Sequence, residues 1–147
     1  MKKRLASLNS IKKLNEVFSF PDIPKSVLLI DSLEIDNFVN HKLLEIYGVK
    51  DVIAFRSPSK ALAYLKETDI TYQLILVDIY LPIMNGFEFI DKFYELNLDK
   101  QHGEICLLSA SLDPLHKQKS KEMNIKFIEK PLTIDKLLSI KQLIIYE

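Results

Sequence analysis

Residues 77–86 read Val77-Asp78-Ile79-Tyr80-Leu81-Pro82-Ile83-Met84-Asn85-Gly86, and this stretch decides how the rest of the chain is interpreted. Its first residues end an apolar run that starts at residue 72, and such a nearly continuous run is typical of a parallel strand covered on both faces. The run stops at Asp78, and the proline and glycine beyond it indicate a loop. A carboxylate that closes an apolar strand is uncommon, so Asp78 is the first candidate functional residue.

Four further apolar runs bring the number of predicted strands to five. The predicted strands cover residues 26–31, 51–55, 72–78, 105–109 and 125–128. The first, third and fourth runs are nearly continuous, as expected of central strands. The other two are more mixed and fit strands nearer the edges of a sheet.

Helical periodicity fills the gaps between these strands. In the first predicted helix, apolar residues at spacings of three and four form one face. They are Ile35, Phe38, Val39, Leu43, Ile46 and Tyr47. Ser57-Pro58 and Asp113-Pro114 are typical helix starts, one helix runs from Gly86 to Leu98, and Thr133 is a plausible N-cap of the last helix. Five strand–helix repeats imply an α/β fold, a doubly wound parallel sheet with helices on both faces.

Composition narrows the class of protein. The 147 residues suffice for one ordinary domain, and 20 basic and 20 acidic residues balance, so charge gives no indication of nucleic acid or an anionic membrane as a partner. No apolar run reaches the eighteen or so residues that a membrane helix needs, and the basic start at Met1 is not followed by an apolar signal segment. We therefore expect a cytoplasmic protein.

The single cysteine, Cys106, lies in an apolar run and is interpreted as a buried structural thiol.

Residues 1–25 form a separate basic amphipathic extension that precedes the domain at 26–147. Its apolar residues could form one helical face, and they are Leu5, Leu8, Ile11, Leu14 and Phe18. This segment is either a short helix packed on the domain, a frayed tail, or a helix that binds a partner or a second copy. We expect a monomer or a weak dimer.

Polar residues follow the predicted strands at their carboxyl ends. Asp31-Ser32 follows the first strand, Asp78 and Ser109 end the third and fourth, and Lys130-Pro131 follows the fifth. In a doubly wound sheet these ends converge on one edge, where ligands bind. Two carboxylates and a few waters suit Mg²⁺, and a carboxylate can act as a nucleophile towards phosphorus. A hydroxyl and an ammonium could hold the phosphoryl oxygens.

With these motifs in order, residues 26–147 resemble response-regulator receiver domains, of the single-domain, chemotaxis-regulator-like kind. The match rests on the first strand ending at Asp31, on Asp78 with its Pro-x-x-x-Gly loop, on Ser109-Ala110 and on Lys130-Pro131, whose peptide bond is characteristically cis in that family. The resemblance implies a flavodoxin-like sheet of order 2-1-3-4-5. It also implies two-component signal transduction through a phosphoprotein, as in a phosphorelay.

The resemblance assigns a role to each matching residue. Asp78 would accept the phosphoryl group and, with Asp31 and the backbone carbonyl of Tyr80, hold Mg²⁺; Asp31 would do so through water. Ser109 would bond a phosphoryl oxygen, and Lys130 would pair with the acceptor and the transferred group.

The resemblance also implies a switch and partners. Ser109 would move toward the phosphoryl group while the ring of Phe127 turns inward, a bistable packing change biased by local charge. The phosphoryl donor would be a histidine kinase or a phosphotransfer protein. Because the chain ends with its last helix, we expect no output domain, no enzymatic turnover beyond its own phosphorylation and dephosphorylation, and a separate downstream target protein.

One position departs from the family. Ser32 stands where the second acid of the pair is the direct metal ligand, and only a water beside its hydroxyl could fill that position. We expect Glu34 and Asp36 to point elsewhere, so the loss of one charge should weaken Mg²⁺ binding by roughly ten- to a thousandfold. Ser32 therefore leaves an alternative open, a pseudo-receiver that binds partners without phosphorylation.

Two further expectations concern the surroundings of the site. The ring of Tyr80 could shield the phosphoryl group from water, whereas aspartyl-phosphate hydrolases commonly carry an acid at this position, which disfavours a hydrolase. A basic surface is expected near the fourth helix, from His116, Lys117, Lys119, Lys121, Lys126 and Lys136. It is either a solvated face or a docking surface for an acidic partner.

Overall fold

Strands and helices alternate along residues 23–110 and 113–145, the part of the chain that the computed structural model describes. The strands are β1 (Ser26–Ile30), β2 (Asp51–Phe55), β3 (Leu74–Asp78), β4 (Glu104–Ser109) and β5 (Lys126–Glu129). The helices are α2 (Glu34–Ile46), α3 (Pro58–Glu67), α4 (Gly86–Glu95), the 3-10 turn η1 (Leu98–Lys100), α5 (Pro114–Glu122) and α6 (Ile134–Ile145).

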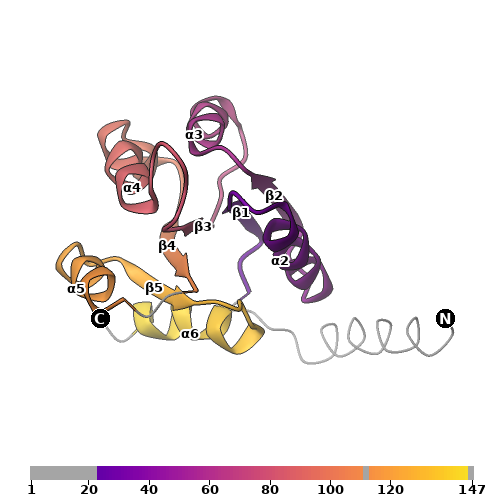
Figure 1. The fold of residues 1–147 in the computed structure, drawn as a ribbon. Coiled ribbons are helices and arrows are strands. Elements are labelled where there is room, and N and C mark those ends of the chain that lie inside the picture. The colour runs from indigo at the N-terminus through magenta and orange to yellow at the C-terminus, as the bar shows by residue number, and fades with distance from the viewer. Residues whose placement is uncertain (1–22, 111–112, 146–147) are drawn as a thin grey trace, which may run out of the picture.

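The five strands form one parallel sheet in the order β2-β1-β3-β4-β5, which confirms the predicted fold and strand order. The nearly continuous apolar runs are the three central strands, and the mixed runs are the two edges. Helices cover both faces of the sheet, as Figure 1 shows. All five strands therefore present their carboxyl ends at one edge of the sheet.

The core is two layers, one on each face of the sheet. Successive strand residues point to opposite faces, so on β1 Leu28 and Ile30 pack with α3 and α4, whereas Val27 and Leu29 pack with α2 and α6. Cys106 belongs to the second layer and is a buried free thiol, as predicted. Burial raises the pKa of this thiol to about 12.

Side-chain caps fix where several helices begin. Ser57 accepts a hydrogen bond from the backbone N–H of Lys60 at 3.3 Å, and Asp113 accepts one from Leu115 at 2.9 Å, as their sequence patterns predicted. The predicted helix from Gly86 to Leu98 is shorter than expected. It ends at Glu95, because Asn97 adopts a left-handed conformation (φ 56°) that leads into η1.

The apolar face of α2 points in an unexpected direction. Such a face normally packs on the core, but Ile35, Phe38 and Val39 are 64%, 58% and 54% exposed. The buried face instead contains Asn37, where the side-chain amide donates to the backbone carbonyls of Asp31 at 2.9 Å and of Phe55 at 3.1 Å. A polar residue faces inward here because it supplies a donor to the carbonyl of Asp31, and a second donor to the carbonyl of Phe55, which also accepts the backbone N–H of Asp31 at 3.0 Å.

The predicted helix in the extension 1–25, from Leu5 to Phe18, lies outside the described residues, so its role stays a prediction. Among the residues that the structure does describe, no helix combines the length and apolarity needed to cross a membrane.

Gly86 offers a direct test of how tightly the loop after β3 is packed. A Cβ at this position lies only 2.7 Å from the carbonyl oxygen of Asp78 and 2.9 Å from the Cα of Ile79, both backbone atoms that cannot move independently. We expect Gly86→Ala to lower the free energy of unfolding by about 1–3 kcal/mol through overpacking. Urea denaturation measures this, with the exposed Glu88→Ala in the same helical turn as control. Equal stability of the two variants contradicts the close packing.

Candidate functional site

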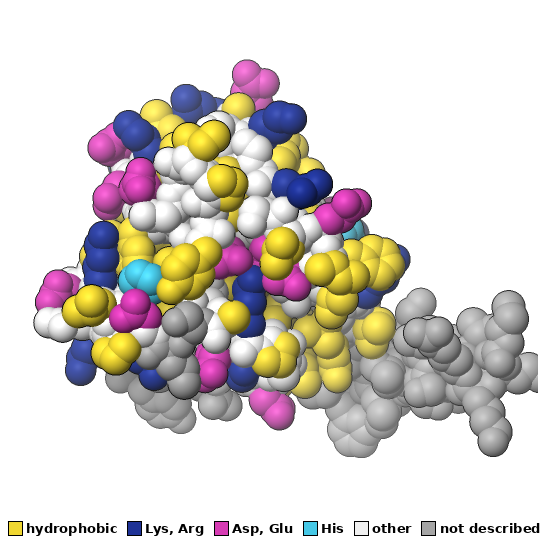
Figure 2. Space-filling model, viewed as in Figure 1, with side chains coloured by type: hydrophobic (Ala, Val, Ile, Leu, Met, Phe, Trp, Pro, Cys, Tyr) yellow, Lys and Arg dark blue, Asp and Glu magenta, His cyan; other side chains and the backbone are white. Residues whose placement is uncertain are grey.

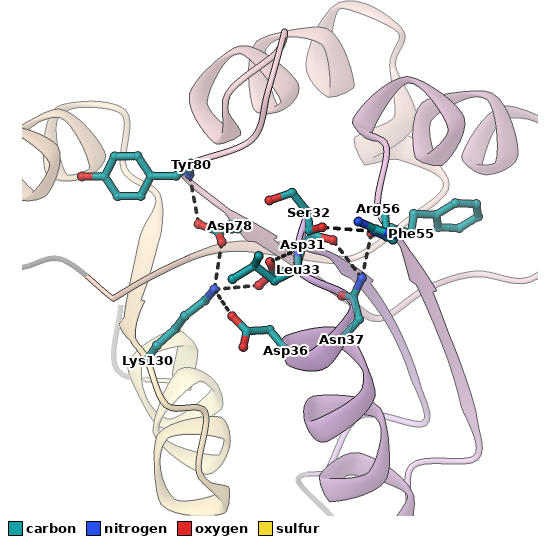
Figure 3. A network of polar contacts seen from close by, with 10 residues as sticks. All are labelled: Asp31, Ser32, Leu33, Asp36, Asn37, Phe55, Arg56, Asp78, Tyr80 and Lys130. Carbon is teal, nitrogen blue, oxygen red and sulfur yellow. Dashed lines mark hydrogen bonds and ion pairs between the residues drawn. The ribbon is translucent and has the colours of Figure 1, made fainter.

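The residues singled out at the strand ends meet at one edge of the sheet. Asp31 directly follows β1, Asp78 is the last residue of β3, Ser109 is the last residue of β4, and Lys130 directly follows β5. Figure 3 shows Asp31, Asp78 and Lys130 pointing toward one another from three separate segments. The peptide bond between Lys130 and Pro131 is cis, as the resemblance implies.

The ammonium of Lys130 lies at the centre of a carboxylate cluster. Its Nζ is 2.6 Å from Asp31 Oδ2, 2.8 Å from Asp78 Oδ2 and 2.9 Å from Asp36 Oδ2. Each contact is a charge-assisted hydrogen bond, so one cation joins the ends of β1 and β3 to the start of α2.

The two buried acids are held in the same way. Asp31 Oδ1 accepts the backbone N–H of Leu33 at 2.9 Å, and Asp78 Oδ1 accepts the backbone N–H of Tyr80 at 2.9 Å. In each carboxylate, one oxygen thus accepts the backbone N–H of the residue two positions later in the chain, and the other oxygen bonds Lys130. These bonds fix the orientation of both acids before any ligand arrives.

Burial decides the electrostatics of the cluster. The side chains of Asp31 and Asp78 are 3% and 8% exposed. Burial raises the pKa of Asp31 above its ordinary value, against the opposing effect of the hydrogen bonds from Lys130 and Leu33. Burial alone would lower the pKa of Lys130, but the carboxylates that surround it raise that pKa above its ordinary value. The ammonium therefore stays charged at neutral pH.

The expectation that Asp36 points away from the site is wrong. The helix begins at Glu34 rather than at Leu33, so its first turn directs Asp36 toward Lys130. Glu34 does point elsewhere, toward Arg56 at 3.9 Å with its side chain 85% exposed. Sequence reasoning also missed Asn37, whose amide binds the carbonyl that precedes Ser32 and so positions the strand end. The sequence held no signal for this role, because apolar periodicity placed Asn37 on the face expected to meet solvent.

The charges of the cluster suit a divalent cation. Three carboxylates and one ammonium leave two net negative charges in a pocket made of oxygen donors, the ligands that Mg²⁺ prefers. Within residues 23–110 and 113–145, no group of three or more acidic, histidine or cysteine side chains is arranged to hold a metal ion by itself, and in this cluster Lys130 lies between the three carboxylates. Mg²⁺ commonly binds through one or two carboxylates and keeps its waters, so the donor set fits it.

Tyr80 lies beside the cluster but its ring points away from Asp78, toward α5 (Figure 3). Its hydroxyl is 3.2 Å from His116 Nδ1, and the two rings meet edge-to-face with centroids 5.4 Å apart. The position of the ring does not support the expected shielding of a phosphoryl group.

The two residues of the expected switch lie on neighbouring strands. Ser109 is completely buried, and its carbonyl accepts the backbone N–H of Lys130 at 2.8 Å. Phe127 is half-buried and packs against the core layer under α3 and α4. It also lines a groove of about 380 Å³ together with Lys117, Ser120 and Glu129. A change in the packing of this ring therefore reaches the surface.

The expected basic surface includes fewer free side chains than the six predicted residues, because Lys126, Lys136 and His116 make contacts within the domain. Lys126 Nζ donates to the carbonyl of Ile140 at 3.0 Å, and Lys136 Nζ donates to the carbonyls of Glu129 and Pro131 at 2.8 and 3.0 Å. His116 contacts Tyr80. The remaining lysines of the set lie on the exposed side of α5.

Comparison with known proteins identifies a family that matches this chain. A family model described as the response regulator receiver domain matches residues 27–142. The two-component response regulator 24 of Arabidopsis thaliana is 29% identical over 116 residues, which cover 78% of this chain and 80% of that protein. Other curated relatives are longer proteins, and the alignments cover 61% of one and 7% of another.

Solved structures show the same fold. A two-component response regulator from Cytophaga hutchinsonii superimposes with a TM-score of 0.72 at 30% identity, over 83% of this chain and 97% of that chain. The receiver domain of the histidine kinase CKI1 from Arabidopsis thaliana, complexed with Mg²⁺ and BeF₃⁻, gives a TM-score of 0.71 over 84% of this chain and 91% of that chain. Its 19% identity shows the fold alone.

The raised pKa of Asp31 leads to a prediction about stability. Its ordinary value is 3.8, and the native value is higher, so the native state binds more protons in the interval between them. The contribution of Asp31 to stability therefore falls as pH rises through that interval. In EDTA at pH 7, we expect the free energy of unfolding of Asp31→Asn to be about 1 kcal/mol higher than that of the native chain. Urea denaturation measures this difference. This advantage should vanish well below pH 3.8, where the carboxyl is protonated in both states.

Asp91→Asn, on the exposed side of α4, is the matched control and should change stability by less than about 0.5 kcal/mol at every pH. A pH-independent difference between Asp31→Asn and the native chain contradicts the assigned cause.

Proposed function

The chain belongs to the response regulator receiver domain family of two-component systems, and from that premise we propose that it accepts a phosphoryl group on Asp78 and signals by binding another protein. The observation that carries the proposal is the 2.8 Å contact between Lys130 Nζ and Asp78 Oδ2 inside a buried carboxylate cluster. A surface aspartate needs no such partner, whereas a nucleophile towards phosphorus needs a fixed orientation and a cation beside it.

The chemistry follows from the residues at hand. An oxygen of Asp78 forms a bond to the phosphorus of the donor, the bond from phosphorus to the donor's leaving atom breaks, and that atom departs with the electron pair. The product is an acyl phosphate. Lys130 is charged and already within hydrogen-bond distance of the acceptor, so its ammonium can balance the negative charge of the transferred group.

We further propose that Asp31, Asp78 and the backbone carbonyl of Tyr80 hold Mg²⁺, with a water beside Ser32 completing the coordination. When bound, the cation neutralises oxygens of the phosphoryl group during transfer. The buried orientation of Asp31 and Asp78 and the two net negative charges of the cluster support this assignment. A solved neighbour of the same fold, the receiver domain of a histidine kinase, is itself complexed with Mg²⁺.

The response to phosphorylation is proposed to use Ser109 and Phe127. The hydroxyl of Ser109 bonds a phosphoryl oxygen, and the ring of Phe127 then moves inward from its half-buried position. Because this ring lines the groove between α5 and β5, the movement changes the shape of a surface that a target protein can contact.

The proposed donor is a histidine kinase or a phosphotransfer protein, and the proposed output is a separate target protein. Beside the pocket, Leu33, Ile35, Phe38 and Val39 are each more than half exposed on the first turns of α2 and the residue before it. Figure 2 shows hydrophobic side chains over α2 next to the charged residues of the pocket. An apolar surface beside the acceptor supports docking of a donor protein there.

Ser32 favours a second candidate function, a pseudo-receiver that binds partners without being phosphorylated. Its side chain carries no charge, and its carbonyl accepts a hydrogen bond from Arg56 Nε at 3.1 Å. The intact contacts of Asp78 with Lys130 and Tyr80 favour the phosphorylated receiver over this alternative.

A small-molecule phosphodonor in a Mg²⁺ series separates the two candidates. We expect the intact mass of the native protein to rise by one phosphoryl group, and Asp78→Asn to show no rise because the nucleophilic oxygen is gone. Asp91→Asn, which removes an exposed acid on α4, should be modified like the native protein.

Two other results have a clear meaning. No modification of the native protein together with modification of Ser32→Asp supports the pseudo-receiver. Modification that survives in Asp78→Asn contradicts Asp78 as the acceptor.

A further inference from the structure

We propose that Asp36 takes over the charge of the acid that Ser32 lacks and so completes the divalent-cation site. This inference rests on the proposed function, since it concerns the same pocket. It assigns a metal-site role to a residue that lies outside the motif matched in the sequence, on the first turn of α2 and one helical turn beyond Ser32.

The first observation is position. Asp36 Oδ2 and Asp78 Oδ2 both lie within 3 Å of the same atom, Lys130 Nζ, as does Asp31 Oδ2. Figure 3 shows Asp36 reaching this point from the helix side, opposite the strand from which Asp78 projects. The carboxylate of Asp36 therefore lies in the same pocket as the two buried acids.

The second observation is availability. The side chain of Asp36 is 33% exposed, so it lies at the rim of the pocket, where a hydrated cation has access. Both oxygens of Asp31 and of Asp78 are engaged, one by a backbone N–H and one by Lys130. Among the described residues, the carboxylate of Asp36 is hydrogen-bonded only to Lys130, through Oδ2. Its other oxygen is available to a cation or to a water bound to it.

The third observation is charge. Asp31 and Asp78 against Lys130 leave one net negative charge, which is too little to balance a divalent cation. Asp36 raises this to two. A carboxylate at the rim suits Mg²⁺ in particular, because Mg²⁺ keeps several waters that such a group can bond. The charge missing at Ser32 is thus restored from the helix rather than from the strand end.

The test measures metal binding alone, by calorimetric titration of the full chain with MgCl₂ and no phosphodonor. We expect Asp36→Asn to weaken Mg²⁺ binding by roughly tenfold or more, because one charge beside the cation is lost. Glu34→Gln is the matched control. It removes one charge from the same turn, on a side chain that is 85% exposed and points toward Arg56, and should change the affinity by less than about twofold.

Two more variants separate charge from structure. Asp36→Glu keeps the charge and should keep most of the affinity. Ser32→Asp introduced into Asp36→Asn should restore the affinity by placing the acid at the strand end instead. Thermal unfolding in EDTA verifies that each variant is folded before titration.

The inference is overturned if the native chain binds no Mg²⁺, if Asp36→Asn binds it as tightly as the native chain, or if Glu34→Gln weakens binding as much as Asp36→Asn. These results are distinct from failure of the proposed function. Weaker binding by Asp36→Asn in a chain that takes up no phosphoryl group supports the metal site and contradicts the receiver function. Phosphorylation of the native chain, together with Mg²⁺ binding by Asp36→Asn that is as tight as in the native chain, supports the receiver function and contradicts the role of Asp36 in the metal site.

Discussion

The structure depends on one interaction, the burial of the Lys130 ammonium among three carboxylates. Without that cation, Asp31 and Asp78 would place two nearly buried negative charges next to each other, which costs several kcal/mol per ion in a poorly solvated pocket. With it, each acid has a hydrogen-bonded partner at 2.6 to 2.9 Å. The cation also links the segment after β5 to the ends of β1 and β3. The same contact therefore stabilises the edge of the sheet and orients the proposed nucleophile.

The fold makes this interaction possible because parallel strands present all their carboxyl ends at one edge. The two core layers fix the sheet from both faces, and at Gly86 the loop after β3 packs directly on the backbone of Asp78. Asn37 then ties the start of α2 to the ends of β1 and β2. As a result, the first turn of α2 contributes Asp36 to a site otherwise built from strand ends, with a net charge suited to a divalent cation.

Much of this could be predicted from the sequence, for identifiable reasons. Continuous apolar runs identify central parallel strands, so the contrast between residues 26–31 and 51–55 separates a central strand from an edge strand, whereas the order of the strands was implied by the family resemblance. Asp78 and Lys130 could be brought together because the topology alone places strand ends side by side. The direction of α2 could not be predicted, since apolar periodicity shows that a face exists but not which way it points. Here the amide of Asn37 donates to carbonyls at the ends of β1 and β2, and this orientation of the helix turns Phe38 to solvent and Asp36 toward Lys130.

The most direct test of this account is to identify the residue that carries the phosphoryl group. After exposure to a phosphodonor and Mg²⁺, reduction with borohydride converts an aspartyl phosphate into homoserine, and peptide mass spectrometry locates it. An acceptor positioned by Lys130 predicts homoserine at position 78 and nowhere else in the chain. Homoserine at position 31 or 36, or a phosphoryl group that resists reduction on a serine, contradicts the role assigned to Asp78.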